Sequence, residues 1–206
     1  MTDHLPHSPA ADRNKEAILM HLRGILPARG TGLEIASGTG QHVVWFAAAL
    51  DAWRWQPTDA DPTMLPAIAG WAAQTGLDNV RRPRRLDVRA PVWPSEGPPF
   101  SERFDAIYCA NMLHIAPWET CAGLMRGAAQ YLAPGGVLIT YGPYFEQGVP
   151  TAQSNVSFDE SLRARDPAWG IRRLEEVVAE ATRAGLALRE RHPMPANNLL
   201  LVFAAS

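Results

Sequence analysis

Short apolar stretches alternate with segments whose apolar residues recur at helical spacing along most of the chain. Helices are predicted over Arg13–Leu26, Gln41–Leu50, Pro62–Thr75, Glu119–Leu132 and Ile171–Ala184, and strands over Gly32–Ala36, Trp53–Pro57, Val80–Val88, Phe104–Ala110, Val137–Tyr141, Leu186–Arg191 and Leu199–Phe203. Five alternations of strand and helix predict a parallel sheet that is covered on both faces. The last two strands lack a helix between them and predict an antiparallel hairpin. The sequence thus predicts an α/β fold with a seven-stranded, doubly wound, mostly parallel sheet.

The segments between these elements indicate one domain over residues 1–206, within the usual domain size of about 50–250 residues. Asp12 is the expected N-cap of the first helix, and Gly76 the expected C-cap of the third. Residues 1–12 are polar and are expected to be mobile. Residues 142–170 are too long and polar for a plain connection, so we expect an irregular lid or substrate insertion there.

The composition excludes several classes of protein. Hydrophobic residues make up 47% of the chain and the formal net charge is −2, so a nucleic-acid partner is not expected. Lys15 is the only lysine and lies outside any phosphate-loop motif. The two cysteines form no C-x-x-C pair. Without a signal peptide or a run of about 18 apolar residues, a soluble cytoplasmic protein is expected, with no membrane contact.

A glycine-containing turn joins the first strand to the second helix, at residues 34–40 (Glu-Ile-Ala-Ser-Gly-Thr-Gly). Its glycines let the backbone approach a ligand closely. Asp59 ends the next strand at the spacing expected of a ribose-binding acid, and Asp87 ends the third strand, where it can accept an amine of a purine. The alternatives are a turn without a ligand, an N-cap at Asp59 and a solvated turn acid at Asp87.

This turn resembles motif I of the class I, Rossmann-like, S-adenosylmethionine-dependent methyltransferases, with Ala36 in place of the first glycine. Phe104–Ile107 followed by Asn111–His114, and Leu132–Leu138, also resemble that family's motifs. The resemblance implies a Rossmann-like fold and S-adenosylmethionine as the cofactor. The cofactor-binding residues that we expect from the resemblance and from their placement are Arg13, Asn14, Glu34, Ala36, Ser37, Gly38, Gly40, Asp59, Ala60, Asp87, Val88, Asn111 and Met112.

A narrower resemblance involves Ser8–Asn14, Asn155–Arg172 and Met194–Leu199. These stretches look like an uncharacterised family that is described only as methyltransferase-like or of unknown function. The narrower match implies no particular substrate.

The methyl acceptor is expected to be a small molecule bound near the carboxyl ends of the later strands. His114, Tyr141 and Tyr144 are the candidate catalytic groups, although a backbone-bonded histidine and core or lid tyrosines are the ordinary alternatives. Substrate contacts are expected from Tyr144, Arg172, Asn197 and Asn198, for which a solvated arginine and an asparagine turn are the alternatives. No metal site is expected.

Two other functions remain open from the sequence. An NAD(P)-dependent oxidoreductase would use the same kind of sheet, but Val43 stands where a dinucleotide fingerprint has a third small residue. A non-catalytic cofactor-binding module is the second alternative. The Asn/Asp-Pro-Pro-Tyr signature of amino-methylating enzymes is absent after the fourth strand, which disfavours a DNA or RNA acceptor.

Overall fold

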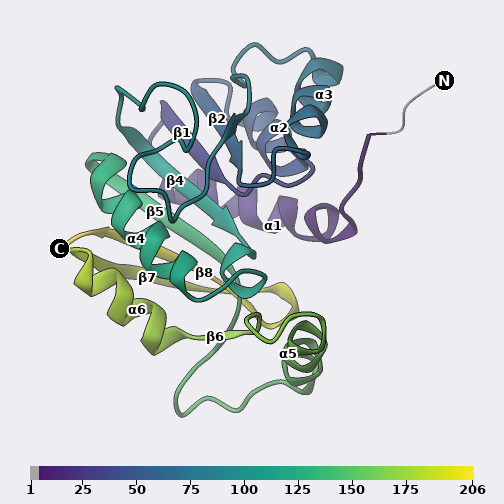
Figure 1. The fold of residues 1–206 in the computed structure, drawn as a ribbon, viewed down its shortest axis with the longest axis vertical. Helices are drawn as coiled ribbons and strands as arrows, with labels where there is room; N and C mark the ends of the chain where they lie inside the picture. The colour runs from purple at the N-terminus through teal and green to yellow at the C-terminus, as the bar shows by residue number, and fades with distance from the viewer. Residues whose placement is uncertain (1–4) are drawn as a thin grey trace.

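A computed structural model describes residues 5–206, and its central feature is one twisted sheet with helices on both faces (Figure 1). The strands are β1 (Gly30–Ile35), β2 (Trp53–Asp59), β3 (Arg84–Arg85), β4 (Phe104–Ala110), β5 (Leu132–Phe145), β6 (Arg172–Arg173), β7 (Leu186–Met194) and β8 (Asn198–Ala205). The helices are α1 (Pro9–Ile25), α2 (Gln41–Ala49), α3 (Leu65–Thr75), α4 (Glu119–Tyr131), α5 (Gln153–Arg165) and α6 (Leu174–Arg183), with short 3-10 turns η1 (Met112–His114) and η2 (Pro195–Asn197).

The strand order is β3-β2-β1-β4-β5-β8-β7, with β6 paired to the end of β5. Strands β1 to β6 pair in parallel, whereas β8 pairs antiparallel with both β5 and β7. The predicted α/β fold with a mostly parallel sheet and an antiparallel hairpin is therefore confirmed. The sheet has eight strands instead of seven because the two-residue strand β6 adds to β5.

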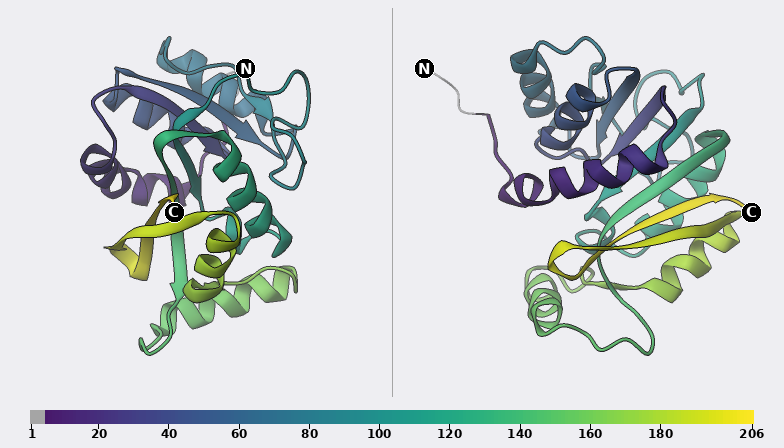
Figure 2. Two further views of the ribbon diagram at one scale, coloured as in Figure 1. Left: turned by 90° about the vertical axis from the view of Figure 1, so that its left-hand side faces the viewer. Right: turned by 180° about the vertical axis from the view of Figure 1, so that it is seen from behind.

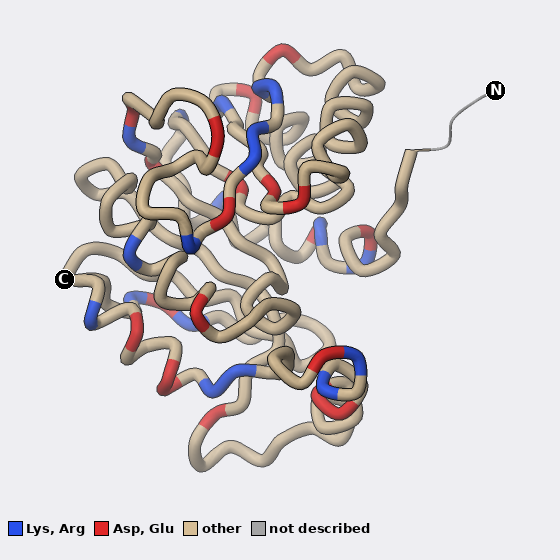
Figure 3. The backbone as a smooth tube through the Cα atoms, in the orientation of Figure 1, with Lys and Arg blue, Asp and Glu red and all other residues tan. Residues whose placement is uncertain are grey.

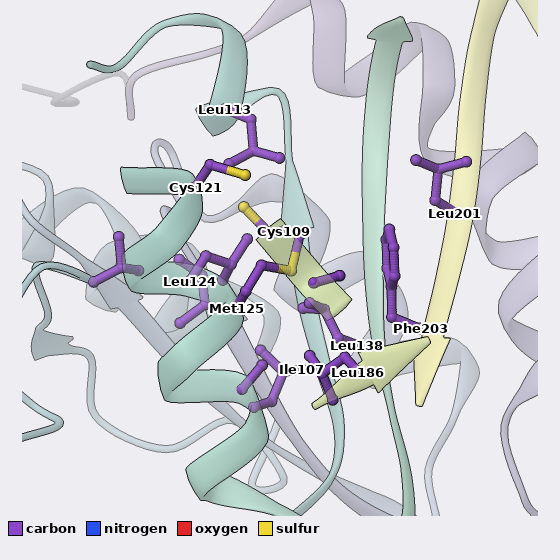
Figure 4. Packing of buried hydrophobic residues seen from close by; sticks show 14 of the residues in the cluster. Ile107, Cys109, Leu113, Cys121, Leu124, Met125, Leu138, Leu186, Leu201 and Phe203 are labelled. Atoms are coloured by element: carbon purple, nitrogen blue, oxygen red, sulfur yellow. The ribbon is translucent and has the colours of Figure 1, made fainter. Parts of the chain in front are cut away.

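Two apolar clusters fill the space between the sheet and its helices. Helices α1, α2 and α3 cover one face, where Ile18, Phe46 and Ile68 are fully buried; the view from behind in Figure 2 shows α1 lying across it. Helices α4 and α6 cover the other face. There Cys109 and Cys121 are buried among Leu124, Met125 and Phe203 (Figure 4), so neither cysteine is exposed.

The N-terminal helix begins four residues earlier than predicted. Ser8, and not Asp12, is its N-cap: the Ser8 hydroxyl accepts a hydrogen bond from the Ala11 amide, and Pro9 occupies the first turn, where its missing N–H costs nothing. Asp12 instead pairs with Lys15 inside the first turn. Residues 1–4 lie outside the described residues, so the mobility of the N-terminal segment stays a prediction.

The segment 142–170 is more regular than the sequence predicted. Strand β5 continues to Phe145, and helix α5 occupies Gln153–Arg165. The helix escaped detection because it buries just two of its residues, Asn155 and Leu162, and thus lacks an apolar stripe. Gly76 ends α3 in the left-handed conformation, as predicted.

The predicted third strand, Val80–Val88, is reduced to the two residues of β3. Val80 makes an isolated bridge to Trp55, and Pro83 interrupts the ladder because it has no N–H to donate. The stretch after β3 still ends at the same edge of the sheet as β1, β2 and β4.

Candidate functional site

A cavity of about 330 Å³ opens at the carboxyl ends of β1, β2 and β4. The chain order reverses here, since β1 lies between β2 and β4, and ligands bind at such reversals in open α/β sheets. Among the residues that line the cavity are seven predicted cofactor residues, namely Ala36, Gly38, Asp59, Ala60, Asp87, Val88 and Met112. Four segments far apart in the sequence thus meet at one cavity, as the motif spacing predicted.

The turn after β1 holds three residues with left-handed backbone, Ala36 (φ 54°), Gly38 (φ 54°) and Gly40 (φ 88°). Ala36 thus adopts the conformation that suits the glycine of the methyltransferase motif. A Cβ on Gly38 would have no heavy atom within 4 Å, so this glycine leaves open space at the cavity. A Cβ on Gly40 would lie 2.8 Å from the Ile68 Cα, so Gly40 serves the packing of the turn against α3.

Asp59 ties this turn to the end of β2. Its carboxylate accepts hydrogen bonds from the amides of Gly38 and Asp61, each at 2.9 Å. A carboxylate has about four acceptor positions, so two more donors can bind it. Burial raises the pKa of Asp59 above its usual value. The alternative role as a helix N-cap does not hold, because Met64 caps α3.

Glu34 lies buried beneath the turn, and its Oε2 atom has no hydrogen-bond partner among the described residues. Burial raises the pKa of this carboxyl to about 8, although a hydrogen bond with Ser37 opposes the shift. An unpartnered carboxylate oxygen is costly when buried, and a cationic ligand group beside it would offset that cost. Glu34, Ser37 and Gly40 do not line the 330 Å³ cavity itself.

The stability of the unliganded protein is expected to fall as the pH rises from about 6.5 to 8, which lies above the range where deprotonation of the unfolded chain at His42 and His114 raises it. The folded state keeps a proton on Glu34 up to about pH 8 that the unfolded chain releases near pH 4.5, so deprotonation over this range favours unfolding. Urea denaturation at several pH values between about 6.5 and 8 measures the slope. Glu34→Gln should flatten it, and an unchanged slope in this variant would show that Glu34 is not its source.

Asp87 lines the cavity together with Arg89, to which it is paired. Its carboxylate accepts from Arg89 Nε at 3.0 Å and from Nη2 at 2.7 Å, which lowers the pKa of Asp87. Arg89 also lines the cavity. A purine amine would therefore share Asp87 with Arg89.

Arg13 and Asn14 of α1 are not among the residues that line this cavity. Asn14 Oδ1 lies 2.7 Å from His42 Nε2, and its side chain bonds the Tyr141 hydroxyl. Asn14 thus joins the opening turns of α1 and α2 to the end of β5. A role of Arg13 and Asn14 in cofactor binding stays a prediction.

Asn111 follows β4 in a left-handed conformation (φ 60°), and its amide donates to the Tyr141 carbonyl at 2.8 Å. It stands between Ala110 and Met112, which line the cavity, but does not line it. A Cβ on Gly142 would lie 3.3 Å from Asn111 Oδ1, so the Asn111 side chain points toward β5.

His114 is unsuited to the predicted role of a general base. The imidazole is buried, its Nδ1 accepts from the Arg172 amide at 3.3 Å, and its Nε2 has no partner among the described residues. Burial lowers the pKa of His114 to about 3, so the ring stays neutral near pH 7. The bond at Nδ1 leaves the proton on Nε2, which is then a donor rather than a base.

Tyr141 and Tyr144 lie on opposite faces of the sheet. Tyr141 packs in the cluster under α1, whereas Tyr144 packs in the cluster under α4 and α6. The Tyr144 hydroxyl donates to Thr140 Oγ1 at 2.9 Å, and burial raises its pKa. The two tyrosines therefore cannot act together on one acceptor.

The predicted substrate residues also separate. Tyr144, Asn197 and Asn198 line a second cavity, of about 220 Å³, where β5, β7 and β8 meet α5. Arg172 lies elsewhere and donates to the carbonyls of Leu113, Ala116 and Ala168, with its guanidinium over the Trp118 ring. These bonds use the Nε and Nη2 hydrogens of Arg172, so Arg172 braces the segment after β4.

Sequence reasoning missed part of the first cavity. Leu86, Arg89, Ile115, Ala116, Pro117 and Thr120 also line it. Ile115 is 44% exposed, although it is a large apolar residue. The apolar run Ile115–Pro117 follows directly after the Asn111–His114 motif. This run could have indicated a surface against which a flat, apolar ring packs.

Charged residues of both signs are interspersed over the chain (Figure 3). Several arginines near β3 pair with acids, as Arg81 does with Glu102 and Arg85 with Glu96.

Within residues 5–206, no three acidic, histidine or cysteine side chains group as a metal site would require. In the same part of the chain, no helix has the length and apolar character to span a membrane.

Comparisons with known proteins place this fold. A family model described as "Protein of unknown function (DUF938)" matches residues 5–205. Similar solved structures include mitomycin 7-O-methyltransferase MmcR (TM-score 0.80, 15% identity, 96% of this chain and 54% of that one). The calicheamicin-biosynthesis methyltransferase CalO1, in its SAH-bound form, has a TM-score of 0.75 at 16% sequence identity, and the match covers 96% of this chain and 55% of CalO1. A third is the O-methyltransferase NcsB1 from neocarzinostatin biosynthesis, in complex with S-adenosylmethionine and 2-hydroxy-5-methyl naphthoic acid. Its TM-score is 0.71 at 16% sequence identity, and the match covers 95% of this chain and 57% of NcsB1.

The chain therefore spans about half the length of these structures, and the likeness confirms the class I methyltransferase fold that the sequence motifs implied.

Proposed function

This chain belongs to the DUF938 family of proteins of unknown function, and we propose that it is an S-adenosylmethionine-dependent methyltransferase that acts on a small molecule. The observation that carries the proposal is the joining of Gly38 to Asp59 at one cavity. Structures of the same fold that contain S-adenosylhomocysteine, or S-adenosylmethionine with a naphthoic acid, support both the cofactor and the size of the acceptor.

The residues present fit this cofactor. Asp59 has acceptor positions left for two ribose hydroxyls, and the open space at Gly38 admits a ligand close to the backbone. Glu34 is buried beneath the turn and does not line the cavity, so its contact with the ammonium group of the cofactor stays a prediction. Ile115 offers an apolar surface to adenine, and Asp87 offers an acceptor to its amine.

The cofactor, when bound, supplies a methyl group on a positively charged sulfur that is open to in-line displacement. The contribution of the chain is to hold acceptor and methyl in line, which is the main source of rate in such a reaction. Neither His114 nor Tyr144 is placed as a base, since His114 is neutral with its proton on Nε2 and Tyr144 donates to Thr140. The acceptor proton therefore goes to solvent in this proposal.

The oxidoreductase alternative is not favoured. Val43 is fully buried in the first turn of α2, where a dinucleotide fingerprint needs a small residue for close packing beside a pyrophosphate. A module that binds the cofactor without transferring methyl groups would share the cavity, and it differs from the proposal only in activity.

Isothermal titration of the folded protein tests the proposed function. We expect one-to-one binding of S-adenosylmethionine and of S-adenosylhomocysteine, and no heat from NADH at the same concentration. Protein that unfolds cooperatively yet gives no heat with S-adenosylhomocysteine would refute the cofactor assignment.

A further inference from the structure

Arg89 lies at the first cavity, and the proposed function gives it no role. It lines the cavity together with Asp87, two positions earlier in the stretch that follows β3. The two side chains form an ion pair, but the Arg89 side chain is 54% exposed. An ion pair this exposed contributes little to stability. The pair is therefore of interest for what it presents to a ligand.

The Asp87 carboxylate accepts several hydrogen bonds from Arg89. Its Oδ1 accepts from the Arg89 amide at 2.9 Å and from Nε at 3.0 Å. Its Oδ2 accepts from Nη2 at 2.7 Å, with Nε also 3.2 Å away. A carboxylate oxygen has about two acceptor positions. Oδ1 is thus used fully, and one position remains on Oδ2.

Arg89 keeps free donors beside that remaining acceptor position. Nη2 carries two hydrogens, of which Asp87 takes one, and Nη1 has no hydrogen-bond partner among the described residues. The guanidinium is planar and rigid, so its free hydrogens are directed by the same contact that binds Asp87. The pair therefore presents an acceptor and a donor side by side, at Asp87 Oδ2 and Arg89 Nη2.

The turn that carries this pair is fixed by its surroundings. The Asp87 amide donates to Ser95 Oγ at 2.6 Å, and the Trp93 indole donates to the Val88 carbonyl at 3.3 Å. A Cβ on Gly123 would lie 2.6 Å from the same carbonyl oxygen, so α4 packs directly against the turn. Side chains on such a support hold the geometry that specific recognition requires.

Free side-chain donors are scarce at this cavity. Its polar lining side chains are Asp59, Asp61, Asp87, Arg89 and Thr120. The three carboxylates accept when ionised, and the Thr120 hydroxyl donates to the Pro117 carbonyl at 2.7 Å. Arg89 is thus the one lining side chain with hydrogens left for a ligand that accepts.

Adenine has groups that complement this pair. Its amine donates, and a ring nitrogen that accepts stands on either side of the amine, N7 on one edge and N1 on the other. Building on the proposed function, we propose that Asp87 and Arg89 recognise the adenine of the cofactor together. The amine donates to Asp87 Oδ2, and Arg89 donates to the ring nitrogen next to that amine. Arg89 is then a specificity-determining residue of this chain.

Isothermal titration with S-adenosylhomocysteine and its 7-deaza and 1-deaza analogues tests this contact. In each analogue a C–H group replaces one ring nitrogen, so the acceptor that Arg89 needs is lost. We expect the wild type to bind one of the analogues at least tenfold more weakly than S-adenosylhomocysteine, and that analogue identifies the nitrogen. Arg89→Ala should weaken S-adenosylhomocysteine by the same factor and leave the binding of that analogue unchanged, because the two changes remove one hydrogen bond. Wild-type binding that is insensitive to both analogues, or losses that are additive with Arg89→Ala, would overturn the inference.

Two further variants separate this contact from a general effect of charge. Arg89→Lys keeps a cation beside Asp87, but a single ammonium group lacks the planar fork, so it should behave as Arg89→Ala does. Full discrimination between the ligands in Arg89→Lys would refute recognition by the fork. Arg82→Ala, at an exposed arginine of the same stretch outside the cavity, should bind all three ligands as the wild type does. Failure of the wild type to bind S-adenosylhomocysteine would contradict the proposed function itself, whereas normal binding without coupling to Arg89 would contradict the present inference alone.

Discussion

Asp59→Ala is expected to weaken the binding of S-adenosylhomocysteine by about a hundredfold or more. In the proposed complex the Asp59 carboxylate accepts both ribose hydroxyls. A hydrogen bond to a charged group contributes about 1.5–3 kcal/mol, so two of them contribute about 3–6 kcal/mol. Each 1.4 kcal/mol corresponds to about tenfold in affinity. The variant also frees the Gly38 amide, which Asp59 now holds at 2.9 Å, and so loosens the turn itself.

Isothermal titration measures this loss, and Asp59→Asn provides a graded comparison because it keeps one acceptor oxygen. Asp78→Ala, at an exposed position away from the cavity, is the matched control and should bind as the wild type does. A dissociation constant within threefold of wild type in Asp59→Ala would mean that the ribose lies elsewhere.

The site could be predicted where local sequence determines it. The turn at 34–40 and the acids at 59 and 87 each follow a strand, and the carboxyl ends of parallel strands meet at one edge. Strand alternation also determines which face a side chain takes. Tyr141 and Tyr144 are three positions apart in the chain, and an odd difference in position puts two strand residues on opposite faces, so their placement was predictable from the two-residue period of a strand.

Other features depend on partners that are distant in sequence. The role of Arg172 follows from three carbonyls near residues 113–116 and 168, and no local pattern reveals carbonyl positions. Helix α5 buries too little apolar surface to produce a helical pattern. The motif identified Glu34 as a candidate site residue. That its Oε2 atom has no hydrogen-bond partner among the described residues could not be predicted, because this depends on all the groups packed around it.

Trp93 is the largest such omission. The prolines and glycine of residues 90–103 are typical of a loop, and the structure has neither helix nor strand there, yet Trp93 within it is 1% exposed. Its ring stacks on Tyr131 at 5.5 Å, and the Tyr131 hydroxyl bonds both the amide and the carbonyl of Trp93. The Trp93 indole also donates to the carbonyl of Val88, a residue of the first cavity. A single buried aromatic in a loop has no periodicity by which it could be detected.

Trp93→Ala is accordingly expected to destabilise the protein by about 3–5 kcal/mol, the usual cost of truncating a buried tryptophan. Urea denaturation measures the loss, and Val92→Ala, 43% exposed in the same loop, should change stability by no more than about 0.5 kcal/mol. A loss below about 1 kcal/mol for Trp93→Ala would contradict the packing.

Gly127 of α4 supplies a second test of the same contact. A Cβ on Gly127 would lie 2.0 Å from the Trp93 ring, so Gly127→Ala should destabilise the wild-type protein strongly. The same change should be tolerated once Trp93 is alanine, because the ring that it meets is gone. The two substitutions are therefore expected to be non-additive, with a smaller loss for the pair than the sum of the single losses. Additive losses would show that Gly127 of α4 and the Trp93 ring do not pack as one unit.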